Sequence, residues 1–285
     1  MYVDTNISKK NQKGDTMINL KFIPIILFIV FIHIGLCMAY DLNKKPSTIR
    51  ILTTEEPPTN YTYKGKFTGT TTDIVEEIMR YLNLKVNIEV KPWARSYKIA
   101  KEEPDIVIFT AGRTQERIDH GFYFIGPVIT RKHVLWSKKE SSINITCIND
   151  IKTMNLNIGA MRGDWRTKFF KDQGIKVQEV ANHALNIKKL LKGRFHLWVS
   201  SDIEAPPLLS KLGYDMKEIK ISYIFKEASS YIMISRDTSK DIVKKLQNAY
   251  TDIQKTDFFE NLSKKWSRIL GFELGYSKET GFYVK

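Results

Sequence analysis

The sequence predicts an α/β fold of two lobes, in which each lobe is a mixed, mostly parallel sheet flanked by helices. Strand-like and helix-like patterns alternate along most of the chain, which is typical of α/β layers. The segment Asp105–Thr110 (DIVIFT) contains a continuous apolar run, as expected for a strand covered on both faces. No Gly-, Ser- or Pro-rich linker separates the two halves. Strand-like stretches near 131–137 and 228–235 connect them instead.

In the first half of the chain, the patterns predict three strands and two helices. Residues Thr70–Asn83 place Ile74, Ile78 and Leu82 at a spacing of four, behind threonines that can cap a helix. Val86, Ile88 and Val90 alternate with polar residues, which indicates a strand. The other elements expected here are strands at Thr48–Thr53 and Asp105–Thr110 and a helix at Trp93–Lys101.

The second half continues the alternation and ends in a helical tail. The expected strands are Asn155–Ala160, Leu197–Ser200 and Ser230–Ser235, and the expected helices are Gly163–Gln173, Ala184–Leu191 and two amphipathic segments between Ile242 and Ile269. If this tail packs back on the first lobe, two strands cross between the lobes, which is the anatomy of a hinge beside a cleft. We therefore expect 40–133 to begin lobe 1, 134–229 to form lobe 2, and 230–285 to return to lobe 1.

Length and composition exclude several classes of protein. The 285 residues are 42% hydrophobic, which is enough for a large core, and two cysteines cannot form a disulfide scaffold. The histidines are dispersed and no motif for a nucleophile, a phosphate loop or zinc occurs, so we expect no metal and no cofactor. The net charge is +14, but the lysines are scattered in pairs beside apolar stretches, which argues against a nucleic-acid partner.

The N-terminus predicts export. Lys21 precedes an apolar run of 15 residues, Phe22–Leu36, and Cys37-Met38-Ala39 follows with small residues at its first and third positions. We expect residues 1–39 to be an upstream extension with a signal peptide cleaved after Ala39, although an uncleaved anchor is an alternative. Cleavage would remove four lysines and two aspartates and leave a charge of +12.

One segment carries a specific family resemblance. Residues Asp105–Pro127 read DIVIFTAGRTQERIDHGFYFIGP: a buried strand, small residues, a T-x-x-R turn and an aromatic strand ending in proline. In this order of elements, 40–275 resembles the bacterial periplasmic solute-binding proteins of the polar amino-acid ABC transporter family. That resemblance implies the two-lobed type II periplasmic-binding-protein fold, a periplasmic monomer, a small polar ligand, and a membrane permease of an ABC importer as partner.

The resemblance implies that Arg117 binds a ligand carboxylate, with help from Thr110 and the backbone at Gly112. The chemistry supports this role, because a guanidinium offers two parallel donors to a carboxylate and keeps its charge. A carboxylate that loses its hydration on entering a cleft needs a positively charged partner there. The alternative is that Arg117 is a solvated helix residue near Glu116 and Asp119.

Further residues of lobe 1 are candidates by their position. Trp93 stands where the family has an apolar wall against the ligand, and Arg95 follows it, although core packing and a surface position are the respective alternatives. Tyr61 lies near the usual position of an aromatic lid. Glu55 or Glu56 is able to meet a ligand amine, although both are equally compatible with a solvated loop.

In lobe 2, the candidates are Gly163, Asp164, Ser201 and Asp202. Gly163-Asp164 precedes a predicted helix that Asp164 can cap, and the N–H groups of that helix are able to hold an anion. Amino-acid receptors of the family usually carry an Asp for the α-amino group at the position of Ser201. Here Asp202 follows one residue later, which points it to the other strand face unless a bulge intervenes.

These features favour a binding protein that closes on a small amino-acid-like solute or carboxylate. An enzyme on the same fold, similar to a periplasmic dehydratase, is a second hypothesis; Glu55, Glu56 and Asp202 are then the candidate acids. A ligand sensor for a separate membrane partner is a third. A binding protein needs no catalytic group, and the sequence names none beyond these acids.

Overall fold

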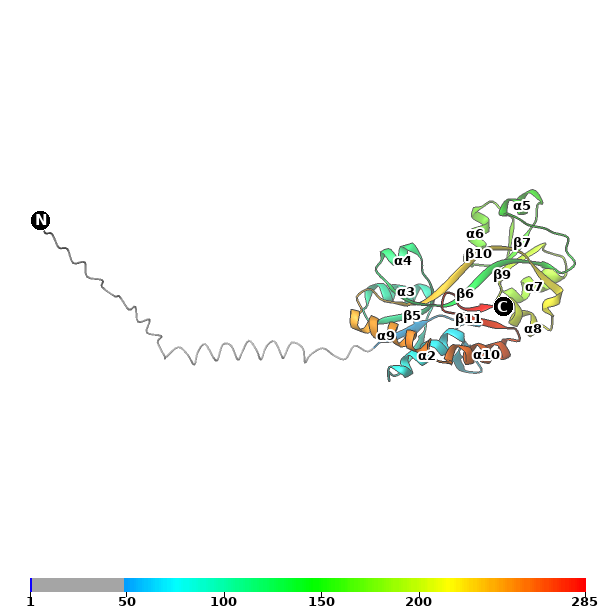
Figure 1. The fold of residues 1–285 in the computed structure, drawn as a ribbon. Coiled ribbons are helices and arrows are strands. Elements are labelled where there is room, and N and C mark those ends of the chain that lie inside the picture. Colours follow the sequence, from blue (N-terminus) through cyan, green and yellow to red (C-terminus); the bar gives the residue numbers. More distant parts are fainter. Residues whose placement is uncertain (2–48) are drawn as a thin grey trace. The chain divides into compact units, whose positions relative to one another are not determined.

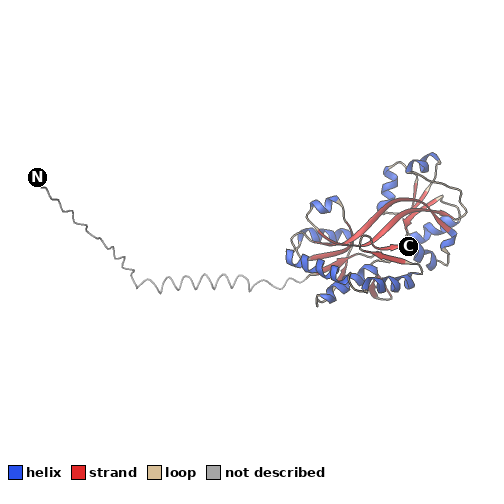
Figure 2. Cartoon of the chain, in the orientation of Figure 1, coloured by secondary structure: helices blue, strands red, loops and turns tan. Residues whose placement is uncertain are grey.

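The computed structural model of the chain describes Met1 and residues 49–285, and Ile49–Lys285 form a compact unit. The predicted signal segment lies outside the described residues. Within the described part, no helix is long and apolar enough to cross a membrane. The unit combines one large sheet with helices on both of its faces (Figures 1 and 2). The predicted α/β class is therefore confirmed.

Two long strands run through the middle of this sheet. β6 (Tyr123–Lys138) and β10 (Ile219–Ile234) pair antiparallel along almost their whole length. β10 also pairs with β5 through Ser230–Ile234, and β6 pairs with β9 through His133–Trp136. Strand-like stretches were expected near these positions, but both strands are longer than their patterns indicate. Through their hydrogen bonds, β6 and β10 join the strands of both lobes into a single sheet. The strand order in this sheet is β4-β1-β5-β10-β6-β9-β7-β8.

The first lobe packs helices around parallel strands. The strands β4, β1 and β5 are parallel, and a small antiparallel hairpin, β2 with β3, lies outside the main sheet. α2 ends earlier than the periodicity predicts, because Asn83 takes a left-handed φ of 54°. The elements are β1 (Arg50–Thr53), β2 (Tyr61–Tyr63), β3 (Lys66–Thr68), α2 (Thr70–Tyr81), β4 (Ile88–Val90), α3 (Trp93–Glu102), β5 (Ile106–Gly112) and α4 (Gln115–Asp119).

The second lobe repeats this arrangement around β7. Its neighbours β8 and β9 are both parallel to it, and β9 then pairs antiparallel with β6. Separate apolar clusters form on this lobe around Phe170 and Trp198. The elements are α5 (Ile148–Thr153), β7 (Ile158–Met161), α6 (Trp165–Asp172), β8 (Val177–Val180), α7 (His183–Leu191), β9 (Leu197–Ser201), α8 (Ala205–Lys211) and a 3-10 turn at Met216–Glu218.

The tail returns to the first lobe. The apolar stripes of α9 (Lys240–Ile253) and α10 (Phe258–Leu270) join the cluster formed by α2 and β5. A hairpin that the sequence patterns did not predict follows, β11 (Leu274–Ser277) with β12 (Gly281–Val284), and β12 meets β6 at Ile129. A Cβ at Gly281 would lie 2.3 Å from the backbone of Val128, so this close approach requires glycine.

The long strands also separate two sides of the molecule. In Figure 1, α3 and α4 of the first lobe and α5 and α6 of the second rise on one side of β6 and β10, while α2, α10 and β11 lie on the other. The residues described next come from turns, from the first turns of helices, from the ends of β5 and β9, and from the middle of β6.

Candidate functional site

Arg117 is held in place by a carbonyl oxygen and two aromatic rings. Its Nη1 donates to the carbonyl oxygen of Gly112 at 2.5 Å. Its guanidinium lies 4.6 Å from the centre of the Trp93 ring and 5.4 Å from that of Tyr97, and these two rings stack on each other. Thr114 caps the short helix α4 and accepts from the backbone N–H of Arg117 at 3.4 Å. The stacked rings and the carbonyl fix the direction of the guanidinium.

The charge of Arg117 has no ionic partner among the described residues. The acids that the sequence places near it are engaged elsewhere: Glu116 accepts from the Tyr97 hydroxyl and Asp119 from Gln115. Burial lowers the pKa of Arg117, and it outweighs the favourable effect of Tyr97 and Glu116. A half-buried cation without a counter-ion is costly, so the geometry leaves this charge available to an anion.

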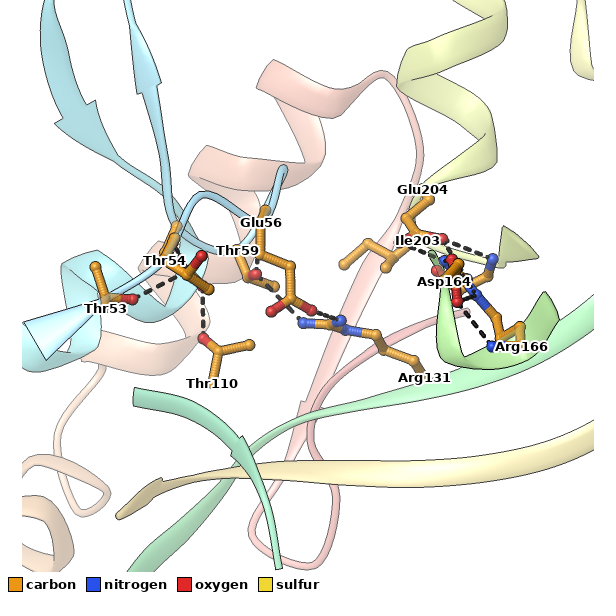
Figure 3. Close-up of polar contacts among 12 residues, drawn as sticks. Thr53, Thr54, Glu56, Thr59, Thr110, Arg131, Asp164, Arg166, Ile203 and Glu204 are labelled. Atoms are coloured by element: carbon orange, nitrogen blue, oxygen red, sulfur yellow. Dashed lines mark hydrogen bonds and ion pairs between the residues drawn. The ribbon is translucent and has the colours of Figure 1, made fainter. Parts of the chain in front are cut away.

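Thr110 lies at the end of β5 in a strained backbone conformation. Its φ is 62°, in the left-handed region that a β-branched residue seldom adopts. Its Oγ1 donates to Oδ1 of Asn60 at 2.6 Å, and Nδ2 of Asn60 donates to Thr53 Oγ1 at 3.1 Å and to the carbonyl oxygen of Thr54 at 2.5 Å (Figure 3). Strain that a buried network maintains is typical of functional sites.

The loop that carries Asn60 also brings Glu56 to the long strand β6. Glu56 forms an ion pair with Arg131, whose side chain is only 9% exposed, and Arg131 also donates to Thr59 Oγ1 at 3.3 Å (Figure 3). A Cβ at Gly69 would lie 2.1 Å from the Thr59 carbonyl oxygen, so the loop can sit here only against glycine. The carboxylate of Glu56 is therefore already paired with a cation.

Ser201 and His133 lie opposite each other on β9 and β6 and leave polar atoms unpaired. Ser201 Oγ, His133 Nδ1 and Arg131 Nε are buried and have no hydrogen-bond partner in the described structure. Strand alternation puts Arg131 and His133 on the same face of β6. Burial, helped by the charge of Arg166, lowers the pKa of His133 to about 4, so the ring is neutral at pH 7. Such unpaired buried groups are uncommon in folded proteins.

Trp165 stands beside this polar group. Its ring meets His133 edge-on at 4.9 Å between centroids, and Nζ of Lys226 lies 5.1 Å from its centre. The residue is 45% exposed although it is large and apolar. An exposed aromatic ring next to unpaired polar atoms is typical of a surface that contacts a ligand.

A buried ionic cluster supports the turn that precedes α6. As the sequence predicts, Asp164 caps the helix, accepting from the backbone N–H of Arg166 at 2.8 Å. The Arg166 side chain binds Asp164 Oδ2 and Glu204 Oε2, both at 2.6 Å (Figure 3). Glu204 also accepts from the backbone N–H of Ser201 at 2.9 Å. Burial would raise the pKa of Glu204, but the charge and hydrogen bonds of Arg166 hold it well below its usual range.

Asp202 lies on the other face of the sheet. The register of β9 against β6 is continuous from Trp198 to Ser201, so no bulge turns Asp202 toward His133. Its carboxylate accepts from the backbone N–H of Lys132 at 3.1 Å and of Ile203 at 2.9 Å. It lines a cavity of about 320 Å³ with residues of β6, β10 and the C-terminal hairpin: Thr130, Lys132, Glu227, Ser277, Thr280, Tyr283 and Val284. The expectation that Asp202 joins the other candidates is therefore not met.

Asp202→Asn is expected to raise the melting temperature by several degrees at pH 8 and to change it little near pH 4. Burial raises the pKa of Asp202 to about 6, whereas an unfolded aspartate titrates near ~3.9. Its stabilising contribution is therefore complete below about pH 4 and is lost as the pH rises through about 6, at ~1.4 kcal/mol per pKa unit. Asparagine keeps the acceptor without the charge.

Thermal unfolding of both proteins from pH 4 to 8 measures this difference. The lowered pKa of His133 acts in the opposite sense, because its contribution is complete above about pH 6.5 and is lost as the pH falls. Comparing wild type with variant cancels that effect. A difference in melting temperature that is the same at pH 4 and pH 8 would contradict the assignment to Asp202.

The remaining predicted residues lie apart from these groups. The Tyr61 ring packs 6.5 Å from that of Trp266 on α10, in the core of the first lobe. Arg95 is exposed on α3, and Glu55 accepts from the backbone N–H of Thr62 at 2.9 Å. Gly163 forms the exposed turn before Asp164 with a φ of 77°.

The structure thus brings together some of the predicted residues and adds others. On the first lobe, Arg117 contacts Gly112 and Trp93, Thr110 contacts Asn60, and Glu56 reaches β6. Asn60, Arg131, His133 and Arg166 escaped the sequence analysis because nothing in their local pattern distinguishes them from ordinary polar residues. A separate cavity of about 630 Å³ between α2 and α10 contains none of these residues.

Comparisons with known proteins agree with this architecture. The model of the bacterial extracellular solute-binding proteins, family 3, matches residues 49–269. The L-cystine-binding protein TcyA of Bacillus subtilis (strain 168) is 24% identical over 206 residues, 70% of this chain and 73% of that protein.

Two solved structures have a similar fold. A mutant of ArgBP from T. maritima aligns with a TM-score of 0.60 and 18% identity, over 77% of this chain and 95% of that one. An ancestral amino acid-binding protein, a precursor of cyclohexadienyl dehydratase, aligns with a TM-score of 0.59 and 16% identity, over 76% of this chain and 94% of that one. Both likenesses confirm the predicted two-lobed type II binding-protein fold.

Proposed function

Because the chain belongs to the bacterial extracellular solute-binding proteins, family 3, we propose that it closes on a small carboxylate solute and delivers it to the permease of an ABC importer. The observation that carries this proposal is the Arg117 guanidinium, which is half-buried, fixed by Gly112 and two rings, and without a counter-ion among the described residues. Two parallel donors on such a group suit a carboxylate.

The proposed hinge is the crossing of β6 and β10 between the lobes. The strand pairings give a path from one lobe to the other. Gly112 on β5 pairs with Ser230 on β10, which pairs with Ile129 on β6. Four residues further along β6, His133 pairs with Ser201 on β9. With strands ~4.8 Å apart and ~3.3 Å per residue, the Cα atoms of Gly112 and Ser201 lie on the order of 20 Å apart. A small solute that touches both lobes therefore requires closure, which ligand binding favours by stabilising the closed population.

We propose the lobe boundaries and the location that the sequence predicts. Lobe 1 comprises 40–133 and 230–285, and lobe 2 comprises 134–229. The apolar clusters of the two halves support this division, although Ile203 of lobe 2 packs in the cluster of lobe 1. A family of extracellular proteins and the apolar run Phe22–Leu36 together support export to the periplasm.

The contacts of the three candidate acids favour a binding protein over an enzyme. The ancestral relative is a precursor of a dehydratase, but each candidate acid in this chain is engaged. Glu55 is bound by Thr62, Glu56 is paired with Arg131, and Asp202 lies on the other face of the sheet from His133. A general acid must reach the leaving group, and none of the three is placed to do so.

A thermal-shift screen of the purified protein against amino acids, oxo acids, hydroxy acids and polyamines tests the proposed function. A solute present at 100 times its Kd adds ~2.7 kcal/mol of stability, which for a protein of this size raises the melting temperature by about 5–10 °C. The same solute is expected to reduce the radius of gyration in small-angle scattering. Polyamines alone raising the melting temperature, or a bound carboxylate leaving the scattering unchanged, would contradict the proposal.

A further inference from the structure

The acids around the proposed cleft are all occupied by cations or hydrogen-bond donors of the protein. Glu56 is paired with Arg131, and Arg166 is shared by Asp164 and Glu204. Arg166 offers one positive charge to two carboxylates. The negative charge of Asp164 is also stabilised by the positive N-terminus of α6, which Asp164 caps.

The two other candidate acids, Glu55 and Asp202, are also engaged within the protein. Glu55 receives both the backbone N–H and the hydroxyl of Thr62, at 2.9 and 2.5 Å. Asp202 lines the cavity on the opposite strand face, with Lys132 and Glu227. A ligand ammonium entering the closed cleft would lose its water and find only carboxylates that already pair with a cation or accept hydrogen bonds of the protein, at a cost of several kcal/mol.

The face of the sheet offers neutral and cationic partners instead. Ser201 Oγ, His133 Nδ1 and Arg131 Nε are buried without partners, and all three lie on the strand face that also meets Trp165. A hydroxyl, a neutral imidazole and an N–H donor suit hydroxyl, carbonyl or carboxylate oxygens. Arg117, in the turn after β5, supplies the unpaired positive charge.

Resting on the proposed function, we infer that the solute is an organic acid without an ammonium group: an oxo or hydroxy acid rather than an α-amino acid. Its carboxylate pairs with Arg117, and its oxygen-bearing end meets Ser201, His133 and Arg131. The exposed ring of Trp165, with Nζ of Lys226 over it, packs against the body of the acid.

Isothermal titration with matched pairs of acids tests the inference. Each pair differs only in the group next to the carboxylate: glutamate with 2-oxoglutarate, phenylalanine with phenylpyruvate and 3-phenyllactate, and leucine with its oxo acid. In every pair that binds, the oxo or hydroxy acid is expected to bind the wild-type protein at least about 10-fold more tightly than the amino acid. The free-energy cost of burying an unpaired ammonium group exceeds the difference that a 10-fold ratio of Kd represents.

Two substitutions at one position sharpen the test. Ser201→Asp supplies a carboxylate on the face that lacks a free one, and it is expected to move the preference toward the amino acid of each pair. Ser201→Asn is the matched control: it adds similar bulk without a charge, so it is expected to weaken both members of each pair to a similar extent and not to move the preference toward the amino acid. If Ser201→Asp fails to fold, the wild-type ranking and the control still decide the question.

The outcomes separate this inference from the proposed function. Tighter binding of the amino acids by wild type overturns the inference and leaves a carboxylate receptor intact. Failure of every acid of either kind to bind wild type overturns both, because it removes the role of Arg117 as an anion anchor.

Discussion

Arg117→Ala is expected to weaken binding of the carboxylate solute by at least about 100-fold, which corresponds to ~2.7 kcal/mol. The guanidinium is the one cation of the proposed site on lobe 1 without a counter-ion among the described residues, and two rings and the Gly112 carbonyl already hold its direction. The variant should fold normally, because it removes an unpaired half-buried charge rather than a partner of another charge.

Titration calorimetry of three variants measures this effect. Arg117→Lys keeps the charge but loses the planar fork of donors, so an intermediate loss is expected. Arg95→Ala is the matched control: it removes an exposed arginine from the neighbouring helix α3, and affinity should stay within about twofold. Equal affinities for wild type and Arg117→Ala would show that the solute does not use this anchor.

Arg166→Met is expected to destabilise the protein by about 3–5 kcal/mol, which lowers the melting temperature by roughly 6–20 °C. Arg166 is 5% exposed, and its guanidinium binds both Asp164 and Glu204. Removing it leaves two buried carboxylates without their cation, and burial then raises the pKa of Glu204.

Two comparisons identify the cause of the loss. Adding Glu204→Gln to Arg166→Met removes one of the stranded charges and should recover part of the melting temperature. Arg162→Ala removes an exposed arginine from the turn before α6 and should change it by less than about 2 °C. A melting temperature of Arg166→Met equal to that of wild type would contradict the structural role of the cluster.

Several elements of the fold follow from local patterns. The spacing of Ile74, Ile78 and Leu82 predicts α2, and the apolar run after Asp105 predicts β5, because amphipathic and fully buried segments leave periodic signatures. The C-terminal hairpin was missed because β11 and β12 are short strands that depend on contact with β6 at Ile129.

The candidate site was predictable where neighbours in sequence are neighbours in space. Gly112 and Arg117 are five residues apart, and the T-x-x-R turn between them is a visible motif. The pairs Glu56–Arg131 and Arg166–Glu204, by contrast, join residues 75 and 38 positions apart. No local pattern identifies which of many acidic and basic residues such long-range contacts select.

By itself, the sequence determined the α/β class, the order of the elements and the arginine turn after β5, because helix and strand periodicity, caps and turns act over a few residues. Only the tertiary structure decided which polar groups meet. The continuous register of β9 on β6 turned Ser201 toward His133 and Asp202 to the opposite face, since a strand alternates its side chains with every residue. That alternation, and the pairing of distant charges across the long strands, left the site with a free cation and no free acid among the described residues.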